Sequence, residues 1–202
     1  MLTLEFKKEK SVLLIIDMQN AFVSSKGSLG TMGLDTSRVV KAIEPIKNLA
    51  EEFRKAGRPV IYIQHTHRPD GLDYGLISKV FPPLDGIGHC IDGTWDQEII
   101  EELKPQDNDI IVKKHRFSAF YGTQLENVLH SLDAETLVVT GISTNICVES
   151  TVRDAFYRDY NVFVPADATG AFTEAEENAS IGNFHFAFAR VTDTEDIIKR
   201  LK

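Results

Sequence analysis

The stretch Val12-Leu-Leu-Ile-Ile-Asp-Met-Gln-Asn20 places five apolar residues in a row directly before a carboxylate. A short, continuous apolar run of this kind is typical of a strand buried on both faces of a parallel sheet. Similar runs recur along the chain and alternate with longer segments of helical spacing, which indicates a parallel sheet covered by helices. The predicted strands are residues 12–17, 59–65, 109–113, 136–141, 161–165 and 190–192.

Helices are predicted between these strands. In residues 35–56, apolar side chains recur at helical spacing from Val39 to Phe53, and Gly57 follows as a C-terminal stop; we expect a kink or a division at Pro45. The other predicted helices are residues 121–132, 145–157 and 173–189, with a short final turn at 195–201. The sequence therefore predicts one α/β domain over residues 1–202, a three-layer Rossmann-like fold whose six-stranded, mainly parallel sheet has helices on both faces.

Two segments interrupt the alternation. Residues 24–34 are rich in Gly and Ser, and residues 67–94 contain three prolines and several glycines, so both are predicted to be loops. Loops of this length in a compact domain usually act as lids or as walls of a substrate site.

Composition and charge restrict the class of partner. The chain has 202 residues and a formal net charge of -8, without a long run of Lys or Arg, which argues against nucleic acid. The apolar run that begins at Val12 is too short for a signal-peptide core or a membrane span, so we expect a cytoplasmic protein that does not bind membranes. In that compartment, Cys90 and Cys147 are expected to be free thiols.

Three polar residues follow apolar runs at predicted strand ends, where ligands bind in open α/β sheets. Asp17 ends the first strand, and burial there would raise its pKa, as a general base requires. Lys114 follows the third strand beside Lys113, and one of the two should point inward. Cys147 lies in a strand-to-helix turn, where a helix N-terminus would stabilise a thiolate.

Each of these residues also has an ordinary structural interpretation. A cysteine inside an apolar stretch is more often a small core residue, the interpretation we adopt for Cys90. An aspartate at a strand end often caps a helix or anchors a loop, and lysine pairs are usually solvated. The pattern alone therefore leaves catalysis open.

Longer segments around these residues resemble, in the same order, the signature blocks of the isochorismatase-like cysteine hydrolases. These segments are Asp17-Met-Gln-Asn20, Lys114-His-Arg-Phe-Ser-Ala-Phe120 and Gly141-Ile-Ser-Thr-Asn-Ile-Cys147-Val-Glu-Ser-Thr151. The resemblance implies that Asp17, Lys114 and Cys147 are catalytic. It also implies a cis peptide bond before Ser143, an oxyanion hole formed by the N–H groups of Ser143 and Cys147, and a homo-oligomer, either a dimer or a tetramer.

Within this family the chain looks most similar to the amidohydrolases of ureidoacrylate, N-carbamoylsarcosine and biuret-type compounds. We therefore expect a cysteine hydrolase that cleaves a C–N bond of a small amide, carbamoyl or ureido substrate through a thioester intermediate, without a cofactor or a metal. One alternative is an isochorismatase-type vinyl ether hydrolase, which would not need Cys147. The other is a metal-assisted nicotinamidase, although His65 stands where those enzymes carry an aspartate; metal binding by His65, His67 and His89 stays open.

The predicted substrate-binding residues are Phe22, His65 and Trp95, which follow the first strand, end the second strand and follow the long loop. Other classes of protein fit less well. A dinucleotide-dependent dehydrogenase would carry Gly-x-Gly-x-x-Gly after the first strand, and this chain does not. A redox role for the Cys147 thiol stays open.

Overall fold

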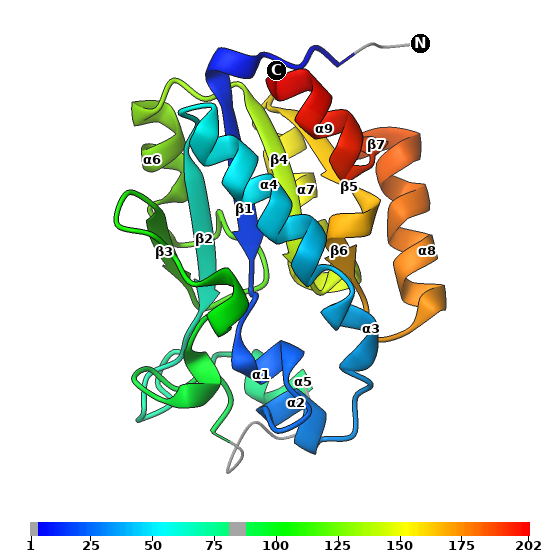
Figure 1. Cartoon of the computed structure of the whole chain (residues 1–202). Coiled ribbons are helices and arrows are strands. Elements are labelled where there is room, and N and C mark those ends of the chain that lie inside the picture. The colour runs from blue at the N-terminus through cyan, green and yellow to red at the C-terminus, as the bar shows by residue number, and fades with distance from the viewer. Residues whose placement is uncertain (1–3, 81–87) are drawn as a thin grey trace.

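A parallel sheet forms the centre of the structure, a computed structural model that describes residues 4–80 and 88–202 (Figure 1). Its strands are β1 (Ser11–Ile16), β2 (Val60–His65), β3 (Ile110–Lys114), β4 (Thr136–Ile142), β5 (Asn161–Pro165), β6 (Thr169–Gly170) and β7 (Arg190–Thr192). Their order is β3-β2-β1-β4-β5-β7, with every pair parallel, and β6 pairs with β4 beside this path. The six predicted strands are confirmed. The seventh, β6, was not predicted, because two residues are too few to show a pattern.

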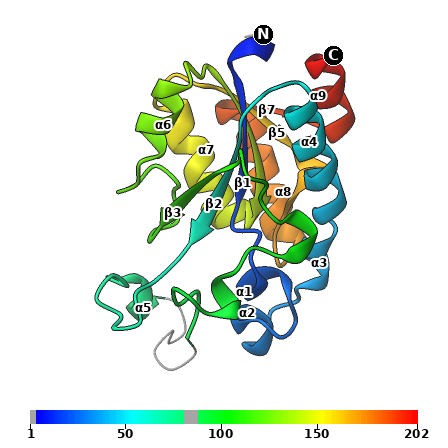
Figure 2. The ribbon, with the colours of Figure 1, turned by 60° about the vertical axis from the view of Figure 1, so that its left-hand side comes forward.

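Helices cover both faces of the sheet. They are α1 (Asn20–Val23), α2 (Ser28–Thr31), α3 (Ser37–Val40), α4 (Ile43–Lys55), α5 (Ile77–Val80), α6 (Leu125–Ser131), α7 (Glu149–Phe156), α8 (Glu174–Asn183) and α9 (Thr194–Leu201). Helices α4 and α9 share a core with Leu13 and Ile15 of β1, whereas α6 and α7 share the opposite core with Leu14 and Ile16. Figure 2 shows the two pairs of helices on opposite sides of the sheet. Successive strand residues point to opposite faces, so β1 supplies both cores and the three-layer prediction is confirmed. Within the described residues, no helix combines the length and the apolar character needed to cross a bilayer.

Several predicted boundaries differ from the structure. The predicted helix over residues 35–56 is divided between α3 and α4, ahead of Pro45, which then lies in the first turn of α4, where backbone N–H groups need no helical partner. Helix α6 begins at Leu125 rather than at Tyr121, after Gly122 with φ 65°.

The two predicted loops contain short helices. Residues 24–34 include α2 and residues 67–94 include α5, so the described part of each predicted loop contains one helical turn that was not predicted. Residues 81–87 of the second segment lie outside the described residues. Both helices have four residues, too short for apolar periodicity to be recognised in a sequence.

The carboxyl ends of β1, β2, β3 and β4 meet at one edge of the sheet. Asp17 follows β1 directly, His65 and Lys114 are the last residues of β2 and β3, and Ser143 follows β4. The register pairs His65 with Lys114, which places these two side chains at the same height. Parallel pairing thus brings together residues that are far apart in the sequence.

Candidate active site

Asp17 lies where the chain leaves β1, and its carboxylate is completely buried. Its backbone adopts φ 52°, a conformation that aspartate tolerates better than most residues, and its N–H donates to the carbonyl oxygen of Ile63 at 2.9 Å. The neighbouring strand approaches closely at Gly141, where an added Cβ would lie 2.1 Å from the carbonyl oxygen of Ile16. Glycine at this position therefore allows the end of β4 to lie beside Asp17.

Lys114 points inward from the end of β3. Its side chain is completely buried, and its Nζ lies 2.7 Å from Oδ2 of Asp17. Lys113 points outward and pairs with Asp92 at 2.7 Å, with both side chains about half exposed. The prediction that one of the two lysines faces inward is confirmed, and that lysine is Lys114.

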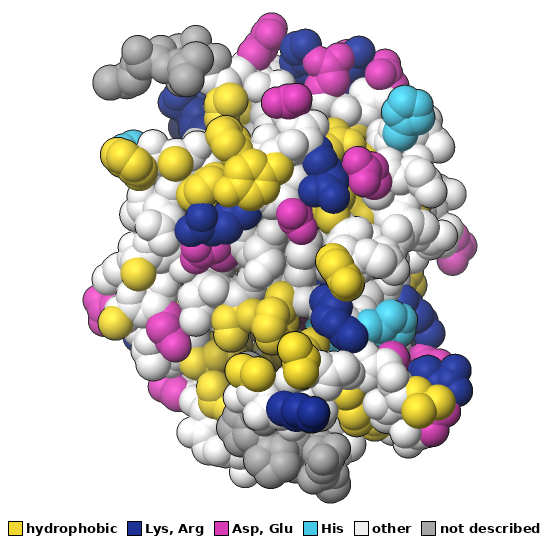
Figure 3. Space-filling model, turned by 180° about the vertical axis from the view of Figure 1, so that it is seen from behind, with side chains coloured by type: hydrophobic (Ala, Val, Ile, Leu, Met, Phe, Trp, Pro, Cys, Tyr) yellow, Lys and Arg dark blue, Asp and Glu magenta, His cyan; other side chains and the backbone are white. Residues whose placement is uncertain are grey.

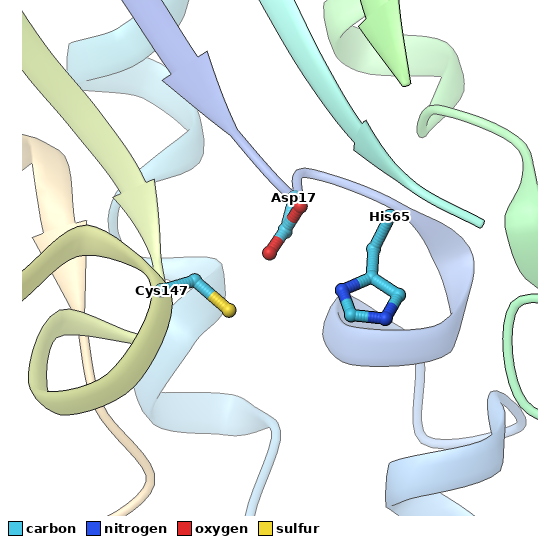
Figure 4. Close-up of side chains that lie close together, drawn as sticks. All are labelled: Asp17, His65 and Cys147. Atoms are coloured by element: carbon cyan, nitrogen blue, oxygen red, sulfur yellow. The ribbon is translucent and has the colours of Figure 1, made fainter. Parts of the chain in front are cut away.

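The Lys114 ammonium also contacts the other groups of the site. It donates to the carbonyl oxygen of Arg116 at 3.1 Å and lies 3.1 Å from Nδ1 of His65 and 3.5 Å from Sγ of Cys147. Figure 4 shows the side chains of Asp17, His65 and Cys147 turned toward a common centre. One oxygen of Asp17, one ring nitrogen of His65 and the sulfur lie within 4.8 Å of one another. The sequence could not show whether Lys114 reaches both Asp17 and Cys147. In the structure, its Nζ contacts both side chains.

Cys147 lies in a π-helical turn, Thr144–Val148, which precedes α7. Burial raises the pKa of its thiol above the ordinary value of 9.0, although the nearby Lys114 charge acts in the opposite direction. The expectation of a thiolate stabilised by a helix N-terminus stays a prediction: Cys147 lies near the start of a π-helix that runs on into α7, whereas desolvation of the sulfur favours the neutral thiol. Desolvation thus favours a thiol that needs a base before it can act as a nucleophile. Cys90, predicted to be a core residue, is fully buried.

Burial and the neighbouring charges also shift the pKa values of Asp17 and Lys114. Burial raises the pKa of Asp17 above 3.8 against the opposing effect of the Lys114 ammonium. Burial acts to lower the pKa of Lys114, but its interactions with the Asp17 carboxylate and the Cys147 sulfur outweigh this effect and raise that pKa above 10.5. The site thus holds a permanent cation beside a carboxylate whose affinity for a proton is increased.

A cavity of about 310 Å³ opens onto the sulfur of Cys147. Its apolar walls include Phe22, Leu29, Leu34, Phe117, Ile146 and Phe172. Its polar lining includes His65, His89, Ser143 and Asn145, together with the exposed Thr173 and Glu176. On the face seen from behind, hydrophobic side chains gather around a hollow in the lower half of the molecule (Figure 3).

Of the predicted substrate-binding residues, Phe22 and His65 lie in the cavity wall. Trp95 is not among the described lining residues; its side chain is half exposed, and its carbonyl oxygen accepts a hydrogen bond from the Asn20 side chain at 2.8 Å. Phe172, which sequence reasoning missed, comes from the segment after β6. No local motif marks it, since only tertiary packing brings that segment to the site.

The expected cis peptide bond is present between Ile142 and Ser143. Ser143 lines the cavity next to Cys147, and its hydroxyl donates to Oδ1 of Asn145 at 2.5 Å. Ser143 and Cys147, the two residues predicted to form the oxyanion hole, therefore both line the cavity.

A chain of hydrogen bonds runs from Lys114 toward the surface. Since the ammonium donates to Nδ1 of His65, the ring carries its proton on Nε2, which lies 2.8 Å from Nε2 of His67. Nδ1 of His67 then lies 3.3 Å from Oδ1 of Asp73. Burial lowers the pKa of His65 well below 6.5 and that of His67 to about 4, so both rings are neutral at pH 7.

The same region contains a group of potential metal ligands. Ligand atoms of His67, Asp73 and His115 lie within 4.8 Å of one another. However, both ring nitrogens of His67 face hydrogen-bond partners, and Nδ1 of His115 donates to the carbonyl oxygen of Thr66 at 2.7 Å. A cation at this place would have to replace these bonds, so the donor atoms fit a hydrogen-bond network better than a metal centre.

Comparison with known proteins shows extensive similarity. Residues 11–196 match the family described as the Isochorismatase domain. The ureidoacrylate amidohydrolase RutB of Methylorubrum extorquens is 35% identical over 201 residues, covering 93% of this chain and 81% of the relative. A cysteine hydrolase from Pseudomonas syringae pv. phaseolicola has a similar structure, with a TM-score of 0.89, 31% identity and coverage of 97% of this chain and 94% of that one. The N-carbamoylsarcosine amidase of Thermoplasma acidophilum has a TM-score of 0.76 and 30% identity over 92% of this chain and 96% of its own.

Proposed function

The chain belongs to the isochorismatase family of hydrolases, and on this premise we propose that it is a cysteine amidohydrolase that cleaves a C–N bond of a small amide, carbamoyl or ureido compound. The observation that carries the proposal is the buried arrangement of Asp17, Lys114 and Cys147 at the end of the cavity. It combines a nucleophile, a base and a cation within contact distance, which is what acyl transfer requires.

The first step forms a thioester. Asp17 takes the proton of the Cys147 thiol, and the sulfur attacks the substrate carbonyl carbon, whose oxygen becomes an oxyanion. The N–H groups of Ser143 and Cys147 stabilise that oxyanion. Asp17 then gives the proton to the nitrogen, the C–N bond breaks, and ammonia or an amine leaves while the acyl group stays on the sulfur.

The second step releases the acid. Asp17 takes a proton from water as the hydroxide oxygen attacks the thioester carbon. The C–S bond breaks, and the sulfur recovers its proton from Asp17. The products are a carboxylic acid and an amine, and the protein returns to its starting protonation state.

Lys114 keeps its proton through both steps. Its charge stabilises the carboxylate of Asp17 before proton transfer and the sulfur anion after it, because Nζ contacts both groups. The cation therefore lowers the free energy of charge separation inside a site from which water is largely excluded.

Assembly and location stay predictions. The resemblance predicts a homo-oligomer, a dimer or a tetramer, and the sequence predicts a cytoplasmic protein. Light scattering coupled to gel filtration checks the first, and fractionation of the source cells checks the second.

The test of the function is ammonia release from a panel of small amides, ureides and carbamoyl compounds. We expect turnover by the wild type and by Cys90→Ala, none by Cys147→Ala, and an acyl adduct on the Cys147 peptide in rapidly quenched samples analysed by mass spectrometry. Turnover retained by Cys147→Ala would overturn the proposal. So would failure of the wild type to release ammonia from every compound.

A further inference from the structure

The described residues of this chain that line the cavity carry no fixed positive charge. None of its described residues is Lys or Arg, and residues 81–87, which the structure does not describe, contain none in the sequence. The charged side chain among the lining residues is the carboxylate of Glu176, which is exposed. The cavity therefore offers a negative charge but no lysine or arginine to a bound molecule.

The two histidines of the wall do not supply the missing charge. Burial lowers the pKa of His65 well below 6.5 and that of His89 to about 4, so both are neutral at pH 7. The geometry at His65 agrees, because its Nδ1 accepts a hydrogen bond from Lys114 and therefore carries no proton. Nδ1 of His89 lies 2.6 Å from Oγ of Ser28. A neutral histidine can orient a substrate by hydrogen bonding, but it does not balance a carboxylate.

Two cations close in sequence to the lining residue Phe117, Lys114 and Arg116, have partners outside the cavity. Lys114 lies behind the wall, 2.7 Å from Oδ2 of Asp17. The guanidinium of Arg116 donates to the carbonyl oxygens of Asp73 and His115, both at 2.6 Å. Neither side chain is among the described residues that line the cavity.

We propose that this cavity selects uncharged amides with an apolar acyl group, and that it discriminates against substrates that carry a carboxylate. The proposal rests on the amidohydrolase function proposed above and narrows its substrate class. It also separates this chain from its relative named for ureidoacrylate, a carboxylate-bearing compound.

The physical argument is desolvation. A carboxylate that enters the cavity loses its hydration without gaining a cation, which is among the most unfavourable changes in a binding site. An apolar acyl group instead gains from burial against Phe22, Phe117 and Phe172. The volume of about 310 Å³ suits a branched alkyl chain or a single substituted ring.

Two pairs of nearly isosteric amides test the proposal. They are 4-methylpentanamide against succinamate, and 4-isopropylbenzamide against 4-carbamoylbenzoate; in each pair an isopropyl group replaces a carboxylate. We expect kcat/KM for ammonia release to favour the neutral member by about 100-fold or more. The same order is expected for binding to Cys147→Ala by calorimetry, which does not depend on turnover.

Variants of Leu34, a half-buried lining residue, test whether an added cation reverses the substrate preference. Leu34→Arg adds a cation and is expected to shift the kcat/KM ratio toward the carboxylate member by about tenfold or more. Leu34→Gln adds polarity without charge and is expected to leave the ratio within about threefold of the wild type. Measuring the ratio of two substrates in one protein removes any general effect of a substitution on folding.

The outcomes separate the two proposals. Equal or better cleavage of the carboxylate members overturns the substrate class while the amidohydrolase function stands. Cleavage of ureidoacrylate with no cleavage of either neutral amide also overturns the substrate class and leaves the amidohydrolase function standing. Absence of ammonia from every compound overturns the function, and the substrate class falls with it.

Discussion

Nζ of Lys114 lies 2.7 Å from Oδ2 of Asp17, and neither side chain has any exposed surface. A buried ion pair of this kind stabilises a fold only while both partners are present, since either charge alone would be buried without compensation. The same contact holds the base of the proposed reaction beside its counter-charge. Stability and activity are therefore linked at this pair.

Removal of one charge should destabilise the protein. We expect Lys114→Met to lower the free energy of unfolding by about 3–5 kcal/mol, because Asp17 then stays buried without its partner. Lys113→Met, which removes the exposed neighbouring lysine, is expected to change it by less than about 1 kcal/mol. Urea denaturation followed by circular dichroism measures both.

Removal of both charges completes the test. We expect Asp17→Asn combined with Lys114→Met to be more stable than Lys114→Met alone, while catalysis stays abolished. The single variant Asp17→Asn is expected to lower kcat by roughly 100- to 10,000-fold through loss of the base. Additive losses of stability in the double variant would contradict the pairing of the two charges.

Acid should destabilise the protein through its buried histidines. The pKa values of His67 and His89 are lowered from 6.5 to about 4 by burial, so between these pH values the unfolded state binds more protons than the folded state. The stabilisation is therefore complete above pH 6.5 and is lost as the pH falls through 4. We expect each histidine to add up to about 1.4 kcal/mol per pH unit to the slope of unfolding free energy in this window.

Denaturation measured from pH 7 to pH 4 checks this slope. His89→Gln should reduce it by close to one proton, whereas substitution of the exposed His130 by Gln should leave it unchanged. Equal slopes in the wild type and His89→Gln would show that His89 is not a neutral buried group.

Strand β1 and Asp17 show what local sequence can predict. A run of apolar residues followed by a carboxylate predicts both a buried strand and a polar group at the sheet edge, because both are consequences of neighbouring residues in the chain. Lys114 was separable from Lys113 only through the resemblance to known motifs. The direction of the Cys147 pKa could not be predicted, because it depends on burial by segments distant in sequence.

The cavity wall shows the limit of local patterns. Leu29 and Phe172 have no motif of their own, and they reach the cavity through the packing of α2 and of the segment after β6. The series of hydrogen bonds from Lys114 through His65 to His67 could not be predicted either, since it depends on ring orientations and on the register of β2 with β3. Features set by tertiary packing therefore could not be predicted from local sequence patterns.

The hydrogen bond between His65 and His67 should position Lys114. We expect His67→Leu to lower kcat by about tenfold, because the Nε2 proton of His65 then loses its acceptor and the ring no longer holds Nδ1 toward Lys114. His67→Gln keeps an acceptor and should restore most of the loss. Similar losses in both variants, or a change of KM alone, would indicate a role in shaping the cavity instead.

The two cysteines should differ in their reaction with iodoacetamide. Cys147 lines the cavity, whereas Cys90 is fully buried, so we expect alkylation at Cys147 in the folded protein. Burial raises the pKa of the Cys147 thiol above 9.0, so the thiolate fraction, and with it the alkylation rate, should be low at pH 7 and rise about tenfold per pH unit up to pH 9. Peptide mass spectrometry on timed samples measures the rate at each cysteine, with Cys147→Ser as the control. A rate independent of pH between 6 and 9 would mean that a stable thiolate pairs with Lys114 at rest, and Asp17 would then lose its role in the first proton transfer.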